Sequence, residues 1–598
     1  MQKLSLIYKN IKRCVGLSYK WMPFYTVMLL ALSVGIAIIP IIQAKVTGDI
    51  VNSITDSVTK GQGIRTVLFL IFLYVLIRLV SDLLSSVNTF FDKRWWNKFS
   101  NDQEIFEMES MSKLEPGHLE DPEFKALLST VKFKGFWSII SLTYAQFTSL
   151  PNLVVLLTTS VIVFRVNPYI IPILIVATSF EFYLQLRYNK HIWMIWQEGG
   201  DRMKVYSHLK ENVTQKVAVT QNRLLKSLDF IVDRARGILD AFNKEQKKAD
   251  WEKIIRSFLA HGLASLGFGF SFYLIINQVF TGKINVGEMV FYLAVLSQYT
   301  GTIDQFFNSI SRQYKDALEV NDIFKIADVT PFIKEIEHPA KLALEGAPSI
   351  EFKNVSFSYA NKKEKILNNF NLKIEAGEKV ALVGNNGAGK TTLIKLLCRF
   401  YDPTEGQILI NGIDLKDLSK AEWYGYLALL FQDYSAYSFT AKESVAMGRV
   451  EEEIDIDKVK NAAVHSGANE FISEWKNQYD EQLGSEFNGI APSQGQEQKI
   501  AIARALYRGG YVLVLDEPTA SVDALSEADI FEKIRTSTEN RTLILISHRF
   551  NTVINMDRII VIEHGSVVEE GSHAKLMKKK NGVYAKMFNS QAAGYSAA

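Results

Sequence analysis

Residues Gly384 to Thr392 read GNNGAGKTT and match the spacing G-x-x-x-x-G-K-[ST] of a phosphate-binding loop. The run Lys379–Val383 before them reads as a short buried strand, and the run Thr391–Cys398 reads as the opening of a helix. Glycines let successive backbone N–H groups face one anion, and the helix N-terminus adds partial positive charge. The loop therefore predicts a nucleoside triphosphate site formed by Gly384, Asn385, Asn386, Gly387, Ala388, Gly389, Lys390, Thr391 and Thr392.

Two side chains of this loop are expected to contact different parts of the ligand. Lys390 would reach the β- and γ-phosphates, and the Thr391 hydroxyl would ligate Mg²⁺. The alternative is a glycine turn that happens to contain a lysine. The full spacing, with a strand before it and a helix after it, favours the phosphate-binding loop.

Two carboxylates follow the apolar strand Tyr511–Leu515. Asp516 ends this strand, which is the usual place for an acid that organises Mg²⁺ near a phosphate loop. Glu517 comes next and could act as the base that polarises the attacking water. A strand that ends in Asp-Glu is weak evidence by itself, but together with the loop upstream it predicts hydrolysis of a nucleoside triphosphate.

The elements that position these residues form only the second half of a long chain. With 598 residues, the chain is expected to hold two to four domains. The net charge of +3 is small for this length, so nucleic acid is not indicated as a partner. Cys14 and Cys398 are far apart in the sequence and have neither metal-ligand spacing nor the pattern of a disulfide framework.

The first half contains six apolar runs of the length that crosses a membrane, which is about 20 residues. We expect spans at Trp21–Ala44, Thr66–Asn88, Phe136–Phe164, Val166–Leu186, Ser257–Phe280 and Val286–Ile310. Lys and Arg gather near the membrane ends of the long charged segments Asp92–Lys134 and Arg187–Arg256. These segments, both chain ends and the ATP-binding domain are therefore expected in the cytoplasm, with the chain a multi-pass protein of the cell membrane.

A few polar residues stand at membrane depth, where they are rare and face protein or a water-filled cavity. They are Glu181, His261, Gln298, Asp304 and Gln305. One interpretation is that Glu181 lies near a cytosolic helix end and that the others make hydrogen bonds between helices. The other is that Gln298, Asp304 and Gln305, on the sixth span, line a polar path for cargo.

The pattern changes after the last span. Ser311–Ile326 reads as an amphipathic helix that leaves the membrane, and residues 327–348 read as a linker. From Ser349 short strands alternate with amphipathic helices, as in an α/β domain. We therefore predict an α-helical membrane domain (residues 1–326, six transmembrane helices with long cytosolic extensions) followed by an α/β P-loop nucleotide-binding domain (residues 349–598).

The order of motifs in the second half is similar to that of the ATP-binding-cassette transporters. SQGQ at residues 493–496 continues through EQKIAIARAL to DEPTASVD, and SHR follows at residues 547–549. With six spans ahead, the chain resembles a half-size exporter, in which one membrane domain is fused to one nucleotide-binding domain. The resemblance implies an ATPase coupled to transport by alternating access, with ATP and Mg²⁺ as cofactors.

The resemblance also implies roles for single residues. Tyr359 would stack on adenine, and Gln432 would contact Mg²⁺ and the attacking water. His548 would hold the γ-phosphate as the switch histidine, although a lone histidine is more often a surface residue. Asp523 falls in the loop that joins the two sites of such a dimer.

The signature loop implies a second copy of the chain. Ser493, Gly495 and Gln496 match the loop that touches the γ-phosphate bound to the opposite subunit. The family usually has LSGGQ there, whereas this chain has PSQGQ, with Pro492 and Gln494 as the departures. Because the remaining catalytic residues are present in one chain, a homodimer with two competent sites is expected.

The sequence gives weaker indications of the cargo and of the helices that couple ATP hydrolysis to its transport. The segments Lys113–Ala126 and Gln221–Ile231 resemble the coupling helices of such exporters. The runs FQDYSAYSFTAKESVAMG and QEQKIAIARALYR are similar to exporters of ribosomally made peptides, which favours a peptide over another small molecule. The alternatives are a multidrug or lipid exporter and a regulatory membrane ATPase that moves no cargo; membrane lipid is a partner in each case.

Overall fold

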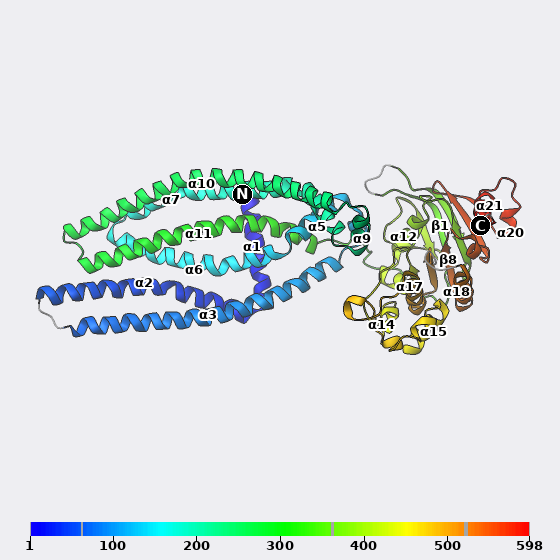
Figure 1. Cartoon of the computed structure of the whole chain (residues 1–598), viewed down its shortest axis with the longest axis horizontal. Coiled ribbons are helices and arrows are strands. Elements are labelled where there is room, and N and C mark those ends of the chain that lie inside the picture. Colours follow the sequence, from blue (N-terminus) through cyan, green and yellow to red (C-terminus); the bar gives the residue numbers. More distant parts are fainter. Residues whose placement is uncertain (1, 61–63, 360–363, 519–523, 597–598) are drawn as a thin grey trace. The chain divides into compact units, whose positions relative to one another are not determined.

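The computed structural model describes residues 2–60, 64–359, 364–518 and 524–596 (Figure 1). The chain divides into two compact units. The first comprises Met1–Leu114 and Pro122–Thr330, and the second comprises Glu115–Asp121 and Pro331–Ala598. The first unit is helical and the second is an α/β domain, so the predicted order of an α-helical domain followed by an α/β domain is confirmed.

The first unit is built from long helices. They are α1 (Gln2–Trp21), α2 (Pro23–Lys60), α3 (Arg65–Ser112), α5 (Pro122–Lys134), α6 (Trp137–Val166), α7 (Ile170–Glu198), α8 (Gly200–Asn212), α9 (Lys216–Leu224), α10 (Leu228–Phe280) and α11 (Val286–Ala327). A helix rises about 1.5 Å per residue, so the 53 residues of α10 extend over about 80 Å. The hydrocarbon core of a bilayer is about 30 Å thick, so much of this helix lies outside it.

Five of the described helices are long and apolar enough to cross a membrane. They are the stretches Pro23–Thr59, Arg65–Ser112, Trp137–Val166, Ile170–Ile192 and Leu228–Phe280. Helix α11 contains the sixth predicted span but is not among them, because glycine and polar residues interrupt its apolar character. Helix α11 also runs without a break to Ala327, so the amphipathic stretch Ser311–Ile326 is its continuation and not a separate helix.

The helices of the first unit lie in pairs: α2 beside α3, α6 beside α11 and α7 beside α10 (Figure 1). Side chains bond across the second pair in a row that we call the α6–α11 seam. Its contacts are Ser138–Glu319 (2.7 Å), Ser141–Asp316 (2.6 Å), Gln146–Gln313 (2.8 Å), Ser149–Gln313 (2.6 Å) and Ser149–Ser309 (2.7 Å). The polar side chains of this seam satisfy one another, as is required where water is scarce.

Two sheets form the second unit. A six-stranded sheet has the order β10-β9-β3-β8-β7-β6, and only β10 runs antiparallel to its neighbour. Its strands are β3 (Lys379–Val383), β6 (Leu427–Leu430), β7 (Val512–Asp516), β8 (Thr542–Ile546), β9 (Arg558–Glu563) and β10 (Ser566–Gly571). An antiparallel sheet of order β2-β1-β4-β5 contains β1 (Ile350–Phe357), β2 (Leu367–Ile374), β4 (Glu405–Ile410) and β5 (Ile413–Asp414).

Strands β7 and β8 are buried along their whole length. Their near-continuous apolar sequences are typical of parallel strands that are covered on both faces. The covering helices include α12 (Lys390–Leu397), α15 (Ile456–Ser466), α17 (Gln494–Arg508) and α18 (Ala524–Ser537). Shorter elements are α4 (Pro116–Glu120), η1 (Leu415–Asp417), α13 (Lys420–Tyr426), α14 (Ala441–Ala446), α16 (Asn469–Ile472), η2 (Gln478–Asp480), η3 (Ser485–Phe487), α19 (Phe550–Val553), α20 (His573–Met577) and α21 (Val583–Ser596).

The two segments expected as coupling helices each contain a break. Lys113–Ala126 spans the end of α3, the short α4 and the start of α5, with prolines at positions 116 and 122 opening both new helices. Gln221–Ile231 spans the end of α9 and the start of α10. Proline suits the first turn of a helix because it lacks the N–H that would be unpaired there. The first segment thus contains a short helix with a turn on either side, and the second is a turn between two helices.

Candidate active site

The predicted catalytic residues meet at one edge of the six-stranded sheet. Strands β3, β8 and β7 are parallel neighbours, and their carboxyl ends lead into Gly384, Ser547 and Glu517 respectively. In parallel sheets this edge is where ligands bind. A cavity of about 470 Å³ opens there, and its lining includes Lys390, Thr391, Gln432, Asp516, Glu517 and His548.

The phosphate-binding loop joins β3 to α12. Gly389 caps the helix with a φ of 103°, a left-handed conformation that glycine adopts without strain. Lys390 is only 7% exposed, and its Nζ donates hydrogen bonds to the carbonyl oxygens of Gly384 (2.7 Å) and Asn385 (3.0 Å). Burial lowers the pKa of the Lys390 ammonium, so a nearby anion such as a phosphate would stabilise its charged form.

Thr391 and Asp516 bring oxygen atoms together beside the loop. The Thr391 hydroxyl donates to Asp516 Oδ2 at 3.4 Å. Asp516 is 2% exposed, and burial, followed by the neighbouring charge of Glu517, raises the pKa of its carboxyl to about 6. Hydroxyl, carboxylate and amide oxygens are the ligands that Mg²⁺ prefers, so Thr391, Asp516 and Gln432 fit this ion.

Glu517 and His548 form a pair across the same cavity. His548 Nε2 lies 3.0 Å from Glu517 Oε1. Glu517 has a φ of 49°, which is uncommon for a residue with a side chain and is found at active sites. Burial, and then the charge of Lys390, lower the pKa of His548. The lowered pKa favours a neutral imidazole, whose Nε2–H can donate to the Glu517 carboxylate.

Tyr359, which is predicted to contact adenine, lies beside the loop. Its hydroxyl is 3.2 Å from Thr392 Oγ1, and its ring packs edge-on against Tyr401 at 5.3 Å between centroids. The Tyr401 hydroxyl and Lys395 Nζ both donate to the carboxylate of Glu120, at 2.5 and 2.6 Å. One face of the Tyr359 ring is therefore supported by a charged and hydrogen-bonded group.

Glu120 belongs to α4, which is part of the second unit although it follows α3 in the chain. Hydrogen bonds also fix the start of α4 to the second unit. The Glu115 carboxylate accepts one from Lys420 Nζ at 2.6 Å and one from the backbone N–H of Ile333 at 3.1 Å. Sequence reasoning missed this link between Glu120 and the nucleotide site. Two prolines around a short acidic segment were its only signal.

The signature residues lie apart from this cavity. Ser493 caps α17, where its hydroxyl accepts from the backbone N–H of Gln496 and the Gln496 side chain accepts from the backbone N–H of Ser493. Among the described residues that line the cavity, none belongs to Ser493–Gln496. Pro492 precedes this capping box without disturbing it. Asp523 lies outside the described residues.

Three of the five polar residues predicted at membrane depth come together. His261 on α10 approaches Glu181 on α7 at 3.2 Å, and Asp304 on α11 interacts electrostatically with both. The Gln185 amide also donates to Glu181, at 3.2 Å. Glu181 thus contacts His261 across two helices, whereas Asp304 interacts with both only electrostatically. Contact of Gln298, Asp304 or Gln305 with cargo stays a prediction.

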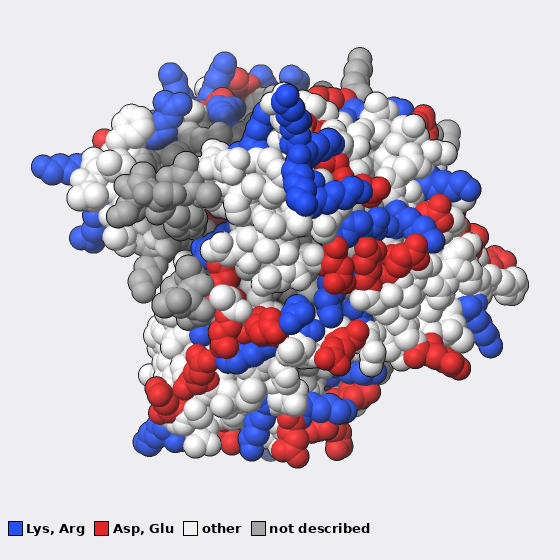
Figure 2. Space-filling view, turned by 90° about the vertical axis from the view of Figure 1, so that its right-hand side faces the viewer, with Lys and Arg blue, Asp and Glu red and all other residues white. Residues whose placement is uncertain are grey.

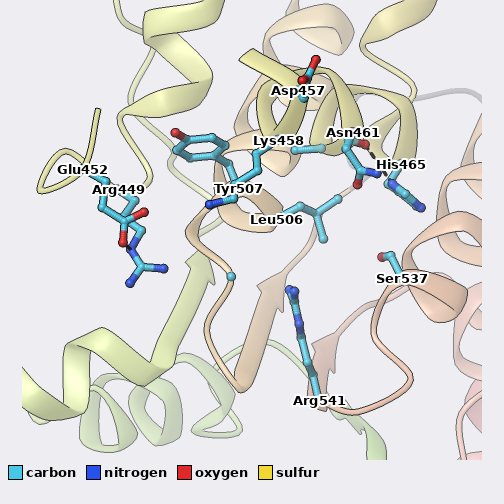
Figure 3. A pocket seen from close by; sticks show the side chains of 12 residues that line it. Arg449, Glu452, Asp457, Lys458, Asn461, His465, Leu506, Tyr507, Ser537 and Arg541 are labelled. Atoms are coloured by element: carbon cyan, nitrogen blue, oxygen red, sulfur yellow. Dashed lines mark hydrogen bonds and ion pairs between the residues drawn. The ribbon is translucent and has the colours of Figure 1, made fainter. Parts of the chain in front are cut away.

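The second unit contains another cavity, of about 480 Å³, which is lined mainly by charged and polar side chains (Figure 3). Helix α15 and the ends of α17 and α18 form it. Basic side chains at its rim have acidic neighbours: Arg449 pairs with Glu452 at 3.1 Å, and Lys458 lies 3.6 Å from Asp455. It contains none of the predicted catalytic residues.

Comparison with known proteins identifies the family. The family model described as ABC transporter matches residues 367–520. An uncharacterized ABC transporter ATP-binding protein of Bacillus subtilis (strain 168) is 32% identical over 455 residues, which cover 74% of this chain and 72% of that protein. This chain belongs to the ABC transporter family.

Two other relatives extend the match over nearly the whole chain. The subtilin transport ATP-binding protein of Bacillus subtilis is 27% identical over 580 residues, or 97% of this ABC transporter and 94% of that protein. The structure of a bacterial Atm1-family ABC exporter with ATP bound has the same fold, with a TM-score of 0.80 at 22% identity over 94% of this chain and 98% of that one. The protein is therefore a membrane protein whose ATPase is coupled to transport, as the sequence predicted.

Proposed function

We propose that this ABC transporter is an ATP-driven exporter that works as a homodimer. The observation that carries the proposal is the separation of the two halves of the site. Lys390, Asp516, Glu517 and His548 surround one cavity, whereas Ser493 lies outside it. In a head-to-tail pair, Ser493 of each copy completes the cavity of the other, and ATP between them holds the two cassettes together.

Within the site, each residue acts on a different part of the reaction. Lys390 balances the charge of the β- and γ-phosphates, and Tyr359 holds the adenine ring. Glu517 takes a proton from the attacking water, and His548, 3.0 Å away, holds the γ-phosphate and fixes the carboxylate. Thr391, Asp516 and Gln432 would hold Mg²⁺, which neutralises charge on the phosphates when it is bound.

A peptide is the cargo that we propose. The subtilin transport protein, which aligns with this chain over 97% of its length, supports a peptide over a lipophilic compound. Basic residues beside the apolar runs support cytoplasmic cassettes and chain ends, so that ATP binding would drive cargo outward. The spans would alternate between two states whose populations ATP shifts.

Mixed dimers test the shared site. The variant Ser493→Ala and the variant Lys390→Ala each damage both sites of a homodimer. If the sites are shared, a mixed dimer has one intact site, because the Lys390 of one copy meets the Ser493 of the other. Co-expression with two affinity tags and tandem purification should then give a species that is more active than either homodimer. Equal inactivity of all three species would contradict a shared site.

Transport into inverted vesicles tests the cargo. ATP-dependent uptake of a basic peptide, with Glu517→Gln as the inactive control, is the expected result. Uptake of a lipophilic dye or movement of a fluorescent lipid in place of the peptide would indicate the multidrug or lipid alternative. ATPase activity without movement of any of the three would indicate a regulatory ATPase.

A further inference from the structure

A cavity of about 270 Å³ lies between α7 and α10, outside every site described so far. These two helices run side by side in Figure 1. Basic side chains dominate its lining, and they come from both helices: Arg187, Lys190, His191, Lys253 and Arg256. On the face drawn in Figure 2, by contrast, acidic and basic side chains are interspersed.

The position of this cavity along the helix pair can be read from two contacts. His261 meets Glu181 at 3.2 Å, and the Tyr188 hydroxyl donates to Asp250 at 2.5 Å. Arg187 and Arg256 both lie between these contacts, so they stand at the same level. Arg187 directly follows the apolar run 166–186, and Arg256 directly precedes the apolar run 257–280. The cavity therefore lies at the surface of the membrane.

The acidic side chains near the cavity do not balance its basic ones. Glu252 pairs with Arg256 at 3.3 Å, and Asp250 is occupied by Tyr188. Within the described part of the chain, Arg187 and Lys190 make no ion pair. Lys253 Nζ lies 4.3 Å above the ring of Tyr188, an orientation that leaves its remaining N–H groups for a ligand. The excess positive charge favours an anion.

Apolar side chains continue from the cavity toward the membrane core. Leu184 lines the cavity itself. Phe180 and Tyr183, one to two turns before Arg187 on α7, and Leu259, one turn after Arg256 on α10, are exposed. A soluble anion would not contact this apolar surface. The acyl chains of an anionic lipid would cover it.

We propose that this cavity binds the phosphate headgroup of an anionic membrane lipid, whose acyl chains lie along α7 and α10. The proposal rests on the proposed function only in that α7 and α10 span the membrane. Arg187, Lys190 and Lys253 would donate to the phosphate, since basic residues beside a membrane span each add about 1 kcal/mol to the binding of anionic lipid. Tyr188 would lie at headgroup level, where aromatic rings are favoured.

Native mass spectrometry of the full-length transporter in detergent tests the proposal, with phosphatidylglycerol and phosphatidylcholine as probes. The wild-type protein should bind phosphatidylglycerol in preference to phosphatidylcholine. The double variant Arg187→Gln/Lys253→Gln should lower that preference about 30-fold, the factor for two basic contacts. The matched control Arg234→Gln/Lys244→Gln removes two exposed basic residues of α10 that do not line the cavity, and it should retain the preference.

Three results would overturn the proposal: equal binding of both lipids by the wild type, an unchanged preference in Arg187→Gln/Lys253→Gln, or displacement of the lipid by millimolar inorganic phosphate. If the double variant does not fold, the salt dependence of lipid binding by the wild type still tests the proposal. Its preference should fall as the salt rises from about 0.1 to about 0.5 M, because salt screens charges. Lipid binding is measured without ATP or cargo, so its failure and a failure of export are separate results.

Discussion

The catalytic cavity and the α6–α11 seam both gather polar side chains away from water, but they use them differently. In the seam, each side chain bonds to another, as Gln313 does with Gln146 and Ser149. In the cavity, Lys390, Asp516 and Glu517 place charges of both signs around an open space. The first arrangement needs no ligand, whereas the second is incomplete without one.

Substitutions in these two regions should therefore affect different properties, the stability of the fold and the rate of catalysis. Changes in the seam should lower the free energy of unfolding and leave nucleotide binding alone. Changes in the cavity should alter catalysis and leave the fold intact, because the strands that carry these residues are buried by other side chains. Four predictions follow from this comparison.

The largest effect is expected in the cavity. Glu517→Gln should lower the rate of phosphate release by about 1,000-fold and leave ATP binding intact, because the amide cannot accept the proton of the attacking water. Release of phosphate and affinity for an ATP analogue should be measured on the same sample. Glu532→Gln, at an exposed carboxylate that pairs with Arg535, is the control and should behave as the wild type. Unchanged hydrolysis in Glu517→Gln would remove Glu517 from its assigned role.

In the seam, Gln313→Ala should lower the free energy of unfolding by about 1–2 kcal/mol, because it removes the hydrogen bonds that join Gln313 to Gln146 and Ser149. Denaturation in detergent measures the change, and ATP affinity should not move. The double variant with Gln146→Ala should cost less than the sum of the two single variants. Strict additivity would show that the two side chains do not interact.

The pH dependence distinguishes the buried acid of the cavity from the bonded acids elsewhere. The pKa of Asp516 is raised to about 6, so its carboxyl becomes protonated as the pH falls through this value. A proton must then leave before Mg²⁺ binds. The Mg²⁺ concentration for half-maximal activity should rise about fourfold between pH 7.5 and pH 5.5. A concentration that is independent of pH would contradict Asp516 as a metal ligand.

The smallest effect concerns the link from α4 to the nucleotide site. Glu120→Gln weakens the contacts with Tyr401 and Lys395. The KM for ATP should rise about threefold at constant kcat, since a weakened hydrogen bond costs about 0.6 kcal/mol. Tyr401→Phe should have the same effect, and combining both changes should add little. A fall in kcat instead of a rise in KM would assign Glu120 a different task.

The sequence predicted the catalytic cavity because its residues follow strands. Gly384, Asp516 and Glu517 each stand at the carboxyl end of a strand with a clear apolar pattern. Once these strands are parallel neighbours, their ends must meet at one edge of the sheet. The helical fold of the first half was predictable for a similar reason, since long apolar runs have few other structures available to them.

The remaining contacts have no local signal in the sequence. Glu120 and Tyr401 are 281 positions apart, and nothing near either residue indicates the other. The α7–α10 cavity depends on the register of two helices that are separated by α8 and α9. The division of the chain shows the same limit, because α4 joins the second unit although its neighbours in sequence belong to the first. Such pairings arise from tertiary packing, which a single sequence does not reveal.

Helix α10 continues from Leu228 to Phe280 without a break, over about 80 Å. A rod of this length acts as a lever. If one end tilts by about 5°, the other end moves by about 7 Å, which exceeds the rise of one helical turn. A small rotation at one end of α10 is therefore enough to displace the other end by more than one helical turn, without any change in the helix itself.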